Sequence, residues 1–185
     1  MRGRKRRWMV VPSAALLALT VWAAPGATGP SGCTIVGTAG NDNLKGTAGD
    51  DVICGKGGID FIRARGGNDL IYGGGGKDII YAGQGDDYVE GNGGNDEIYG
   101  GKGGDNLWGG KDHDVLFGQS GDDWSVVGGR GNDWVYGGRG NDCVASLDGT
   151  GGNDALNGGP GQDVYETDAG DALVKVETAG WCTAG

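Results

Sequence analysis

The chain has 185 residues, of which 45 are glycine and 4 are proline, and its formal net charge is −10. So much glycine and negative charge is typical of low-complexity or disordered chains, unless a period organises the glycines. Collagen is excluded because proline is scarce. A conventional apolar core is therefore not expected.

Residues 1–26 predict a secretory signal peptide. Five basic residues lie within Met1–Arg7, an uncharged apolar stretch covers Trp8–Ala24, and the small residues Ala24-Pro25-Gly26 offer a cleavage site. A membrane anchor is the alternative, although the apolar stretch only just reaches spanning length. We expect an extracellular protein with no membrane span in the mature chain.

Cleavage of this segment changes the charge balance of the chain. Removing its five basic residues leaves 10 Lys and Arg against 25 Asp and Glu, a net charge of −15. Such a surface repels nucleic acid, which needs a positively charged partner. Polyvalent cations are the expected partners instead.

After a lead-in over 27–36, the chain repeats every nine residues, and such repeats define the whole fold where they occur. Aspartates recur at a spacing of nine from Asp42 to Asp123, and insertions of one and three residues precede the last two pairs. An apolar residue follows two positions after each aspartate, with Ser125 as the exception, and the extra residue near Val126-Val127 predicts a bulge. Fourteen repeats thus cover residues 37–166.

Each repeat predicts a six-residue glycine-rich turn ending in aspartate, followed by a three-residue strand with one inward apolar side chain. A single such strand buries almost nothing, so stability must come from stacking the turns into a solenoid. Two repeats complete one coil of eighteen residues, and seven coils make a rod about 34 Å long.

Stacking places the aspartates in two columns of seven. The first contains Asp42, Asp60, Asp78, Asp96, Asp114, Asp133 and Asp154, and the second Asp51, Asp69, Asp87, Asp105, Asp123, Asp142 and Asp163. Carboxylates about 5 Å apart repel one another unless cations lie between them. Surroundings made only of carboxylate and carbonyl oxygens suit calcium, which takes 6–8 such ligands. Each column has six gaps, so the geometry admits at most twelve ions.

Units such as Gly73–Tyr81, Gly100–Trp108 and Gly137–Ala145 resemble the glycine-rich calcium nonapeptides of RTX (haemolysin-type) proteins. The resemblance implies an all-β fold, a parallel β-roll (right-handed β-solenoid), in which aspartates two repeats apart share a calcium ion with turn carbonyls. The expected ligands are Asp51, Asp60, Asp69, Asp78, Asp87, Asp96, Asp105, Asp114, Asp123, Asp133, Asp142 and Asp163. RTX toxins and enzymes carry an effector domain ahead of the repeats, whereas this chain is more similar to short secreted calcium-binding repeat proteins of bacteria.

Two irregular features lie towards the C-terminus. Asp112 replaces a turn glycine, where a positive φ is costly for other residues, and we expect weak or missing calcium beside repeats nine to eleven. Residues 167–185 lose the period and are expected to cap the solenoid, which needs such caps.

Four cysteines in a secreted chain favour two disulfides, with three connectivities open. Cys33 with Cys54 is preferred because their separation of 21 is close to one coil, and Cys143 with Cys182 would then staple the C-terminal cap. A zinc site is disfavoured, because no two cysteines have ligand spacing and the chain has one histidine.

No catalytic residue is expected, and the chain is predicted not to be an enzyme. His113 lacks a nucleophile in triad order, and identical carboxylate pairs in every coil suit a repeated ligand and not one acid with one base. The alternative function is a cell-surface or matrix interaction module with a glycan or protein partner. Its exposed aromatic strip would contain Tyr81, Tyr99, Phe117 and Tyr136 on one sheet, although stabilisation of the stacked strands also explains such a ladder.

Overall fold

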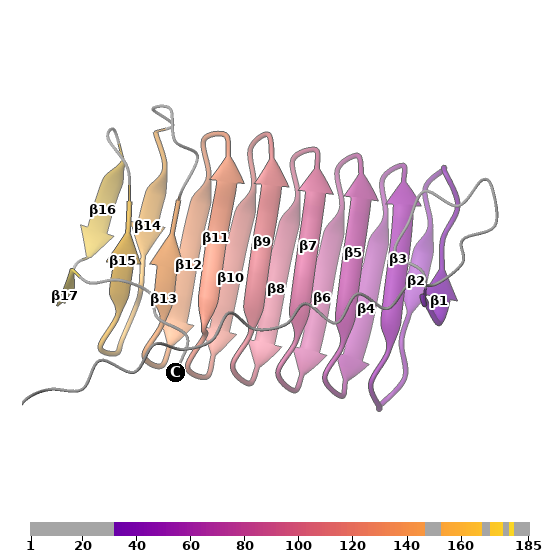
Figure 1. Ribbon diagram of the computed structural model, residues 1–185, viewed down its shortest axis with the longest axis horizontal. Coiled ribbons are helices and arrows are strands. Elements are labelled where there is room, and N and C mark those ends of the chain that lie inside the picture. Colours follow the sequence, from indigo (N-terminus) through magenta and orange to yellow (C-terminus); the bar gives the residue numbers. More distant parts are fainter. Residues whose placement is uncertain (1–31, 147–152, 168–170, 176–177, 180–185) are drawn as a thin grey trace, which may run out of the picture.

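The protein is a parallel β-solenoid of about seven coils, as Figure 1 shows. The computed structural model describes residues 32–146, 153–167, 171–175 and 178–179. The predicted signal peptide lies outside these residues. The predicted fold class is confirmed.

Two sheets form the two walls of the solenoid. The nine-stranded sheet contains, in spatial order, β1 (Ile35–Val36), β3 (Val52–Gly57), β5 (Leu70–Gly75), β7 (Tyr88–Gly93), β9 (Asn106–Lys111), β11 (Ser125–Arg130), β13 (Cys143–Ala145), β15 (Val164–Glu166) and β17 (Thr178–Ala179). The eight-stranded sheet contains β2 (Asn43–Lys45), β4 (Phe61–Gly66), β6 (Ile79–Gln84), β8 (Glu97–Lys102), β10 (Val115–Ser120), β12 (Trp134–Arg139), β14 (Ala155–Asn157) and β16 (Ala172–Lys175).

Each strand pairs in parallel with the strand two places along the chain. Ile53 of β3, for example, is in register with Ile71 of β5, eighteen residues later. Consecutive strands therefore alternate between the two sheets, and two repeats complete one coil (Figure 1). This register brings equivalent residues of successive coils into columns, as the nine-residue period predicts.

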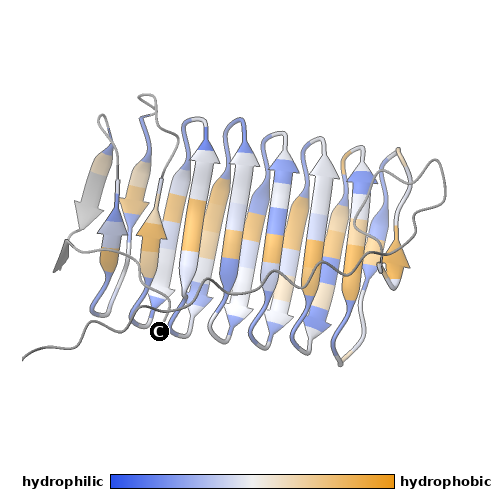
Figure 2. Ribbon diagram, viewed as in Figure 1, coloured by the Kyte–Doolittle hydropathy of each residue, from blue (hydrophilic) through white to orange (hydrophobic). Residues whose placement is uncertain are grey.

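The core is a file of single apolar side chains between the two sheets. These residues are fully buried: Ile53, Ile62, Ile71, Ile80, Val89, Ile98, Leu107, Leu116, Val126, Val135, Val144 and Leu156. Figure 2 shows the hydrophobic bands across the strands and the polar turns beyond them. In each repeat, burying one aliphatic side chain stabilises the fold by about 1.5–3 kcal/mol. Ordering the backbone costs about 1–2 kcal/mol for each of the nine residues. This core alone is therefore too thin to stabilise the fold.

The strands are longer than the sequence predicts. From β3 to β12 each has six residues, so pairing continues through the glycine-rich segment after the predicted triplet. In β5, for example, Gly74 and Gly75 are in register with Asn92 and Gly93. The three-residue length is correct only for strands nearer the ends, such as β2 and β13. The turns between the long strands are correspondingly short.

The extra residue of the tenth repeat lies in the turn, and the predicted bulge at Val126-Val127 is wrong. Ser125 pairs with Asn106 and Val126 pairs with Leu107, so Val126 occupies the buried position. The inserted residue is Trp124, and 59% of its surface is exposed. A Cβ on Gly104 would stand 2.7 Å from the indole nitrogen of Trp124, so glycine there makes room for this ring.

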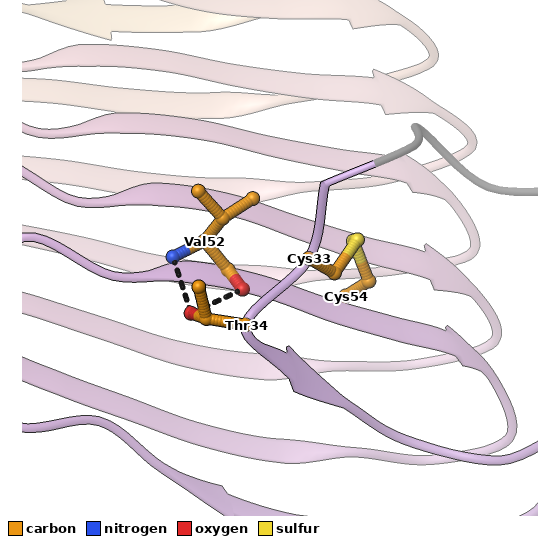
Figure 3. Close-up of a disulfide and its surroundings, with 4 residues drawn as sticks. All are labelled: Cys33, Thr34, Val52 and Cys54. Atoms are coloured by element: carbon orange, nitrogen blue, oxygen red, sulfur yellow. Dashed lines mark hydrogen bonds between the residues drawn. A yellow bond between two sulfur atoms is a disulfide. The ribbon is translucent and has the colours of Figure 1, made fainter. Parts of the chain in front are cut away.

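A disulfide closes the N-terminal end of the solenoid. Cys33 is bonded to Cys54, as predicted, with their Cα atoms 5.9 Å apart (Figure 3). Beside it, the Thr34 hydroxyl donates to the carbonyl of Val52 and accepts from the Val52 amide. Cys143 is also disulfide-bonded, while Cys182, its predicted partner, lies outside the described residues.

Strands continue into the segment expected to cap the C-terminal end. β16 pairs with β14 and β17 pairs with β15, so both sheets extend beyond the last regular repeat. The Ser146 hydroxyl donates to the Asp171 carboxylate at 2.5 Å. No helix among the described residues is long and apolar enough to cross a membrane.

The turns require glycine because their backbone is left-handed and meets the neighbouring coil. Gly94 has a φ of 115°, and a Cβ there would collide with the carbonyl oxygen of Gly76. At the adjacent Gly93 a Cβ would meet nothing closer than 3.9 Å. Asp112, with a φ of 75°, occupies the left-handed region as the sequence suggested.

We therefore expect Gly94→Ala to destabilise the protein by about 2 kcal/mol or more, because left-handed strain adds to a backbone collision. Gly93→Ala is the matched control and should change the unfolding free energy by less than about 0.5 kcal/mol. Thermal unfolding of both variants in calcium measures the difference. Equal stability of the two variants would contradict the turn geometry.

Candidate metal centre

The repeated aspartates are buried at the edges of the two sheets. Those from Asp60 to Asp163 are at most 3% exposed, and Asp51 is 7% exposed. Acidic side chains are almost never fully buried unless they are paired with another group. The structure brings the predicted ligands into the two predicted columns, and each column continues from coil to coil.

From Asp60 onward, one oxygen of each column carboxylate accepts a hydrogen bond from the preceding coil. The amide of Asp60 donates to Oδ1 of Asp78, the amide of Asp78 donates to Oδ1 of Asp96, and both distances are 2.8 Å. The same bond spans all six gaps of each column, from Asp42 to Asp154 and from Asp51 to Asp163. These bonds fix the positions of the twelve accepting carboxylates without neutralising them.

The second oxygen, Oδ2, is buried without a hydrogen-bond partner in nine of these residues. They are Asp60, Asp69, Asp78, Asp87, Asp96, Asp105, Asp114, Asp123 and Asp142. A buried carboxylate oxygen with no donor is unfavourable by several kcal/mol unless a cation or a proton compensates it. The unpartnered oxygens recur at the same place in successive repeats, which indicates a repeated ligand.

In most repeats a glycine five residues before the aspartate leaves an oxygen-lined space beside Oδ2. A Cβ on Gly73 would stand 2.7 Å from Oδ2 of Asp78 and 2.9 Å from the carbonyl oxygen of Gly91 in the next coil. Carboxylate and carbonyl oxygens close together are the ligands that calcium prefers. The residues of the turns therefore fit a hard divalent cation.

Two alanines interrupt this arrangement in the second column. Ala64 and Ala82 stand five residues before Asp69 and Asp87, and both are fully buried. Their methyl groups take the place that glycine leaves open in the other turns. We expect these two turns to bind calcium more weakly than those of Asp105 and Asp123.

The first two repeats satisfy the carboxylate with threonine. The amide of Thr38 donates to Oδ2 of Asp42 at 2.6 Å, and the Thr38 hydroxyl donates to the same oxygen at 2.9 Å. The amide of Thr47 donates to Oδ2 of Asp51 in the same way. Asp51, a predicted ligand, thus differs from the nine aspartates named above, since its second oxygen already has a donor. In the sequence these two turns differ from the later ones in having Gly-Thr at 37–38 and 46–47.

The sites are not clusters of acidic side chains. Among the described residues no three His, Cys, Asp or Glu side chains converge on one point. A calcium ion in a turn would therefore take most of its ligands from backbone carbonyls, with few carboxylates. Such a shell is weakly charged, and weakly charged shells bind calcium less tightly than shells with several carboxylates.

Burial raises the pKa of the aspartates in the middle coils. The pKa of Asp78 is raised to about 6, that of Asp96 to about 7 and that of Asp123 to about 8, in each case chiefly because burial disfavours the anion. The bond from the preceding amide opposes this shift, and the charge of neighbouring aspartates adds to it. A calcium ion beside the carboxylate would favour the anion instead.

A second ladder of side chains, which the sequence analysis missed, lies one residue before the aspartates. Asp86 accepts from the amide of Gly104 at 2.9 Å, and His113 Nδ1 accepts from the amide of Asn132 at 2.8 Å. These bonds point towards later coils, opposite to the aspartate bonds. The signal in the sequence was the recurrence of Asn or Asp directly before the aspartates of the two columns. His113 belongs to this ladder.

The predicted aromatic strip is present and its rings stack on one another. Tyr81 and Tyr99 have ring centroids 4.6 Å apart and an interplanar angle of 2°, and Phe117 and Tyr136 continue the stack at 5.0 Å. Phe61 makes a tilted contact with Tyr81. Because stacking covers the flat faces, mainly ring edges meet the solvent, so the strip contributes to packing between coils.

Comparison with protein families agrees with this geometry. The family model of the RTX calcium-binding nonapeptide repeat, which holds four copies, matches residues 34–62, 55–89, 90–124, 125–149 and 145–174. The chain belongs to the RTX calcium-binding nonapeptide repeat family. RTX nonapeptides in general bind calcium, and their β-roll is typically a structural calcium-binding module. The comparison with curated proteins gives no match.

The raised pKa values predict that, without metal, the RTX roll is more stable in acid than at neutral pH. A buried aspartate whose pKa exceeds the usual 3.8 stabilises the fold below about pH 4, and this stability is lost as pH rises through 6 to 8. In chelator, we expect the thermal midpoint to fall between pH 5 and pH 8. Saturating calcium should remove or reverse this trend, because the ion binds the carboxylate anion. A midpoint in chelator that rises over the same range would contradict the assignment.

Proposed function

We propose that this RTX roll is a secreted protein that binds several calcium ions and folds as it does so, and that it is not an enzyme. The main support is the recurring buried Oδ2 without a hydrogen-bond partner beside a turn carbonyl. Calcium would be held in turns of both columns by the predicted aspartates other than Asp51. The Thr-containing turns of Asp42 and Asp51 would fold without metal and act as an N-terminal cap.

The mechanism is linkage between metal binding and folding. Calcium binds only the stacked turns, because an isolated turn brings together too few oxygens. Each bound ion therefore stabilises the folded state by an amount that grows with calcium concentration. Millimolar extracellular calcium would keep the roll folded. The low calcium concentration of the cytoplasm would leave the chain unfolded before the signal peptide directs its export.

The proposal predicts a cooperative gain of β signal when the oxidised chain without residues 1–26 is titrated with calcium, measured by far-UV circular dichroism. Magnesium should not replace calcium, because it demands a tighter octahedral shell and dehydrates reluctantly. A chain that is already folded in chelator at neutral pH would exclude coupled folding. Its disulfides and aromatic strip would then be the main support of the roll.

Asp105→Asn tests the carboxylate column directly. Asp105 is fully buried with Oδ2 unpartnered, so the amide variant removes one charged ligand with almost no change in shape. We expect the calcium midpoint of folding to rise about tenfold or more, since calcium affinity depends on ligand charge.

Asp86→Asn is the matched control for this variant. Asp86 lies in the same row of turns as Asp105, directly before Asp87 of the second column. It is exposed, and its Oδ1 accepts a hydrogen bond from the Gly104 amide. Asparagine keeps that acceptor and makes the same change in net charge. Its calcium midpoint should stay within about twofold of wild type. Equal shifts for both variants would mean that overall charge, and not the buried column, sets the calcium response.

A further inference from the structure

The outer face of the nine-stranded sheet carries a hollow that the calcium columns do not use. It has a volume of about 390 Å³ and is lined by residues of β7, β9 and β11, with Trp108 beside it. This volume lies within the range of small-molecule sites, which is about 300–1,000 Å³. The aspartates of the two columns are absent from its lining.

Trp108 offers this hollow an aromatic surface that no other ring covers. Trp108 is 45% exposed, and its neighbours in register are Glu90 and Val127. Within the described residues no ring stacks on it, in contrast to the aromatic strip of the other sheet. An indole face that no other ring occupies can stack on a ligand, whereas the strip presents edges.

Two glycines form the floor beside Trp108. Gly110 of β9 and Gly129 of β11 are in register, with φ values of 119° and 101°. A Cβ on Gly110 would collide with the carbonyl oxygen of Asn92 in the neighbouring strand. The backbone geometry therefore keeps side chains off the sheet at this point.

Charged and polar groups form the rim. Lys111 and Arg130 are in register on adjacent strands and both are exposed. Across the hollow, Glu90 accepts from the Tyr88 hydroxyl at 2.6 Å, and the Asn92 side chain donates to the carbonyl of Glu90 at 3.2 Å. The rim thus combines two cations with a carboxylate whose position is fixed by Tyr88.

We propose that this hollow binds a carboxylate-bearing sugar unit of an extracellular polysaccharide. The C–H groups on one face of a pyranose ring are attracted to the negative π face of an indole, as Trp108 provides. Arg130 and Lys111 would bind the sugar carboxylate, which a chain with net charge −10 otherwise repels. Glu90 and Asn92 would contact the hydroxyl groups.

The site depends on the folded roll because its lining comes from three successive coils. Glu90, Trp108 and Arg130 are brought together only by the register of β7, β9 and β11. Sugar binding therefore rests on the folding described above, whether calcium or another interaction stabilises the coils. Measuring folding and binding separately keeps the two proposals apart.

Isothermal titration calorimetry with trimeric galacturonate, in calcium buffer and with the heat of sugar in buffer alone subtracted, tests this site. We expect a dissociation constant of about 1 mM or tighter for the folded wild type, and weaker binding of the neutral trimer of galactose. Trp108→Ala should weaken binding at least tenfold while far-UV circular dichroism in calcium stays unchanged.

Trp134→Ala is the matched control, since Trp134 is a similarly exposed tryptophan on the other sheet, and its binding should equal that of wild type. A variant with both Lys111→Gln and Arg130→Gln changes only exposed side chains and should abolish the preference for the acidic trimer. The proposal fails if the folded wild type binds neither trimer, or if Trp108→Ala binds as tightly as wild type. It fails also if the double variant keeps the preference.

Discussion

The buried carboxylate of the repeated turns is the constraint on which the rest of this protein depends. Its first oxygen is fixed by the amide of the preceding coil, and its second points into an oxygen-lined space. Burying these anions without compensation costs more than one aliphatic side chain in each repeat can offset. The solenoid therefore needs cations or protons at these carboxylates. Its stability consequently depends on calcium concentration and on pH. The disulfide and the threonine turns stabilise the N-terminal end, where that requirement is relaxed.

Much of this architecture could be predicted from the sequence, because a nine-residue period with one apolar residue per repeat leaves few ways to bury that residue. The columns, the coil of eighteen residues, the Cys33–Cys54 bond and the stacked rings from Tyr81 to Tyr136 all follow from position within the period. The tenth repeat could not be placed in this way. Ser125, Val126 and Val127 allow two registers, and packing selects Val126 because it is apolar and fits between the sheets.

Strand length and carboxylate chemistry were harder to predict, because both depend on contacts between coils. Glycine-rich segments suggest turns, yet Gly74 and Gly75 pair with the next coil and extend β5. Nothing in the composition distinguishes the threonines at 38 and 47, but their amides donate to the aspartate four residues later. The hollow beside Trp108 needs three coils in register, and its glycine floor cannot be distinguished from the other glycines by spacing alone.

The unlike outer faces of the two sheets define how this chain can change in length. Because successive repeats alternate between sheets, the stacked rings belong to every second repeat, and Trp108 with its glycine floor belongs to the others. Insertion of one nonapeptide would move each later repeat to the opposite sheet, dividing the ring stack between two faces. Insertion of eighteen residues would leave every later side chain on its own face. The repeat is nine residues long, but the unit by which an RTX roll with two distinct faces can grow or shrink is one whole coil.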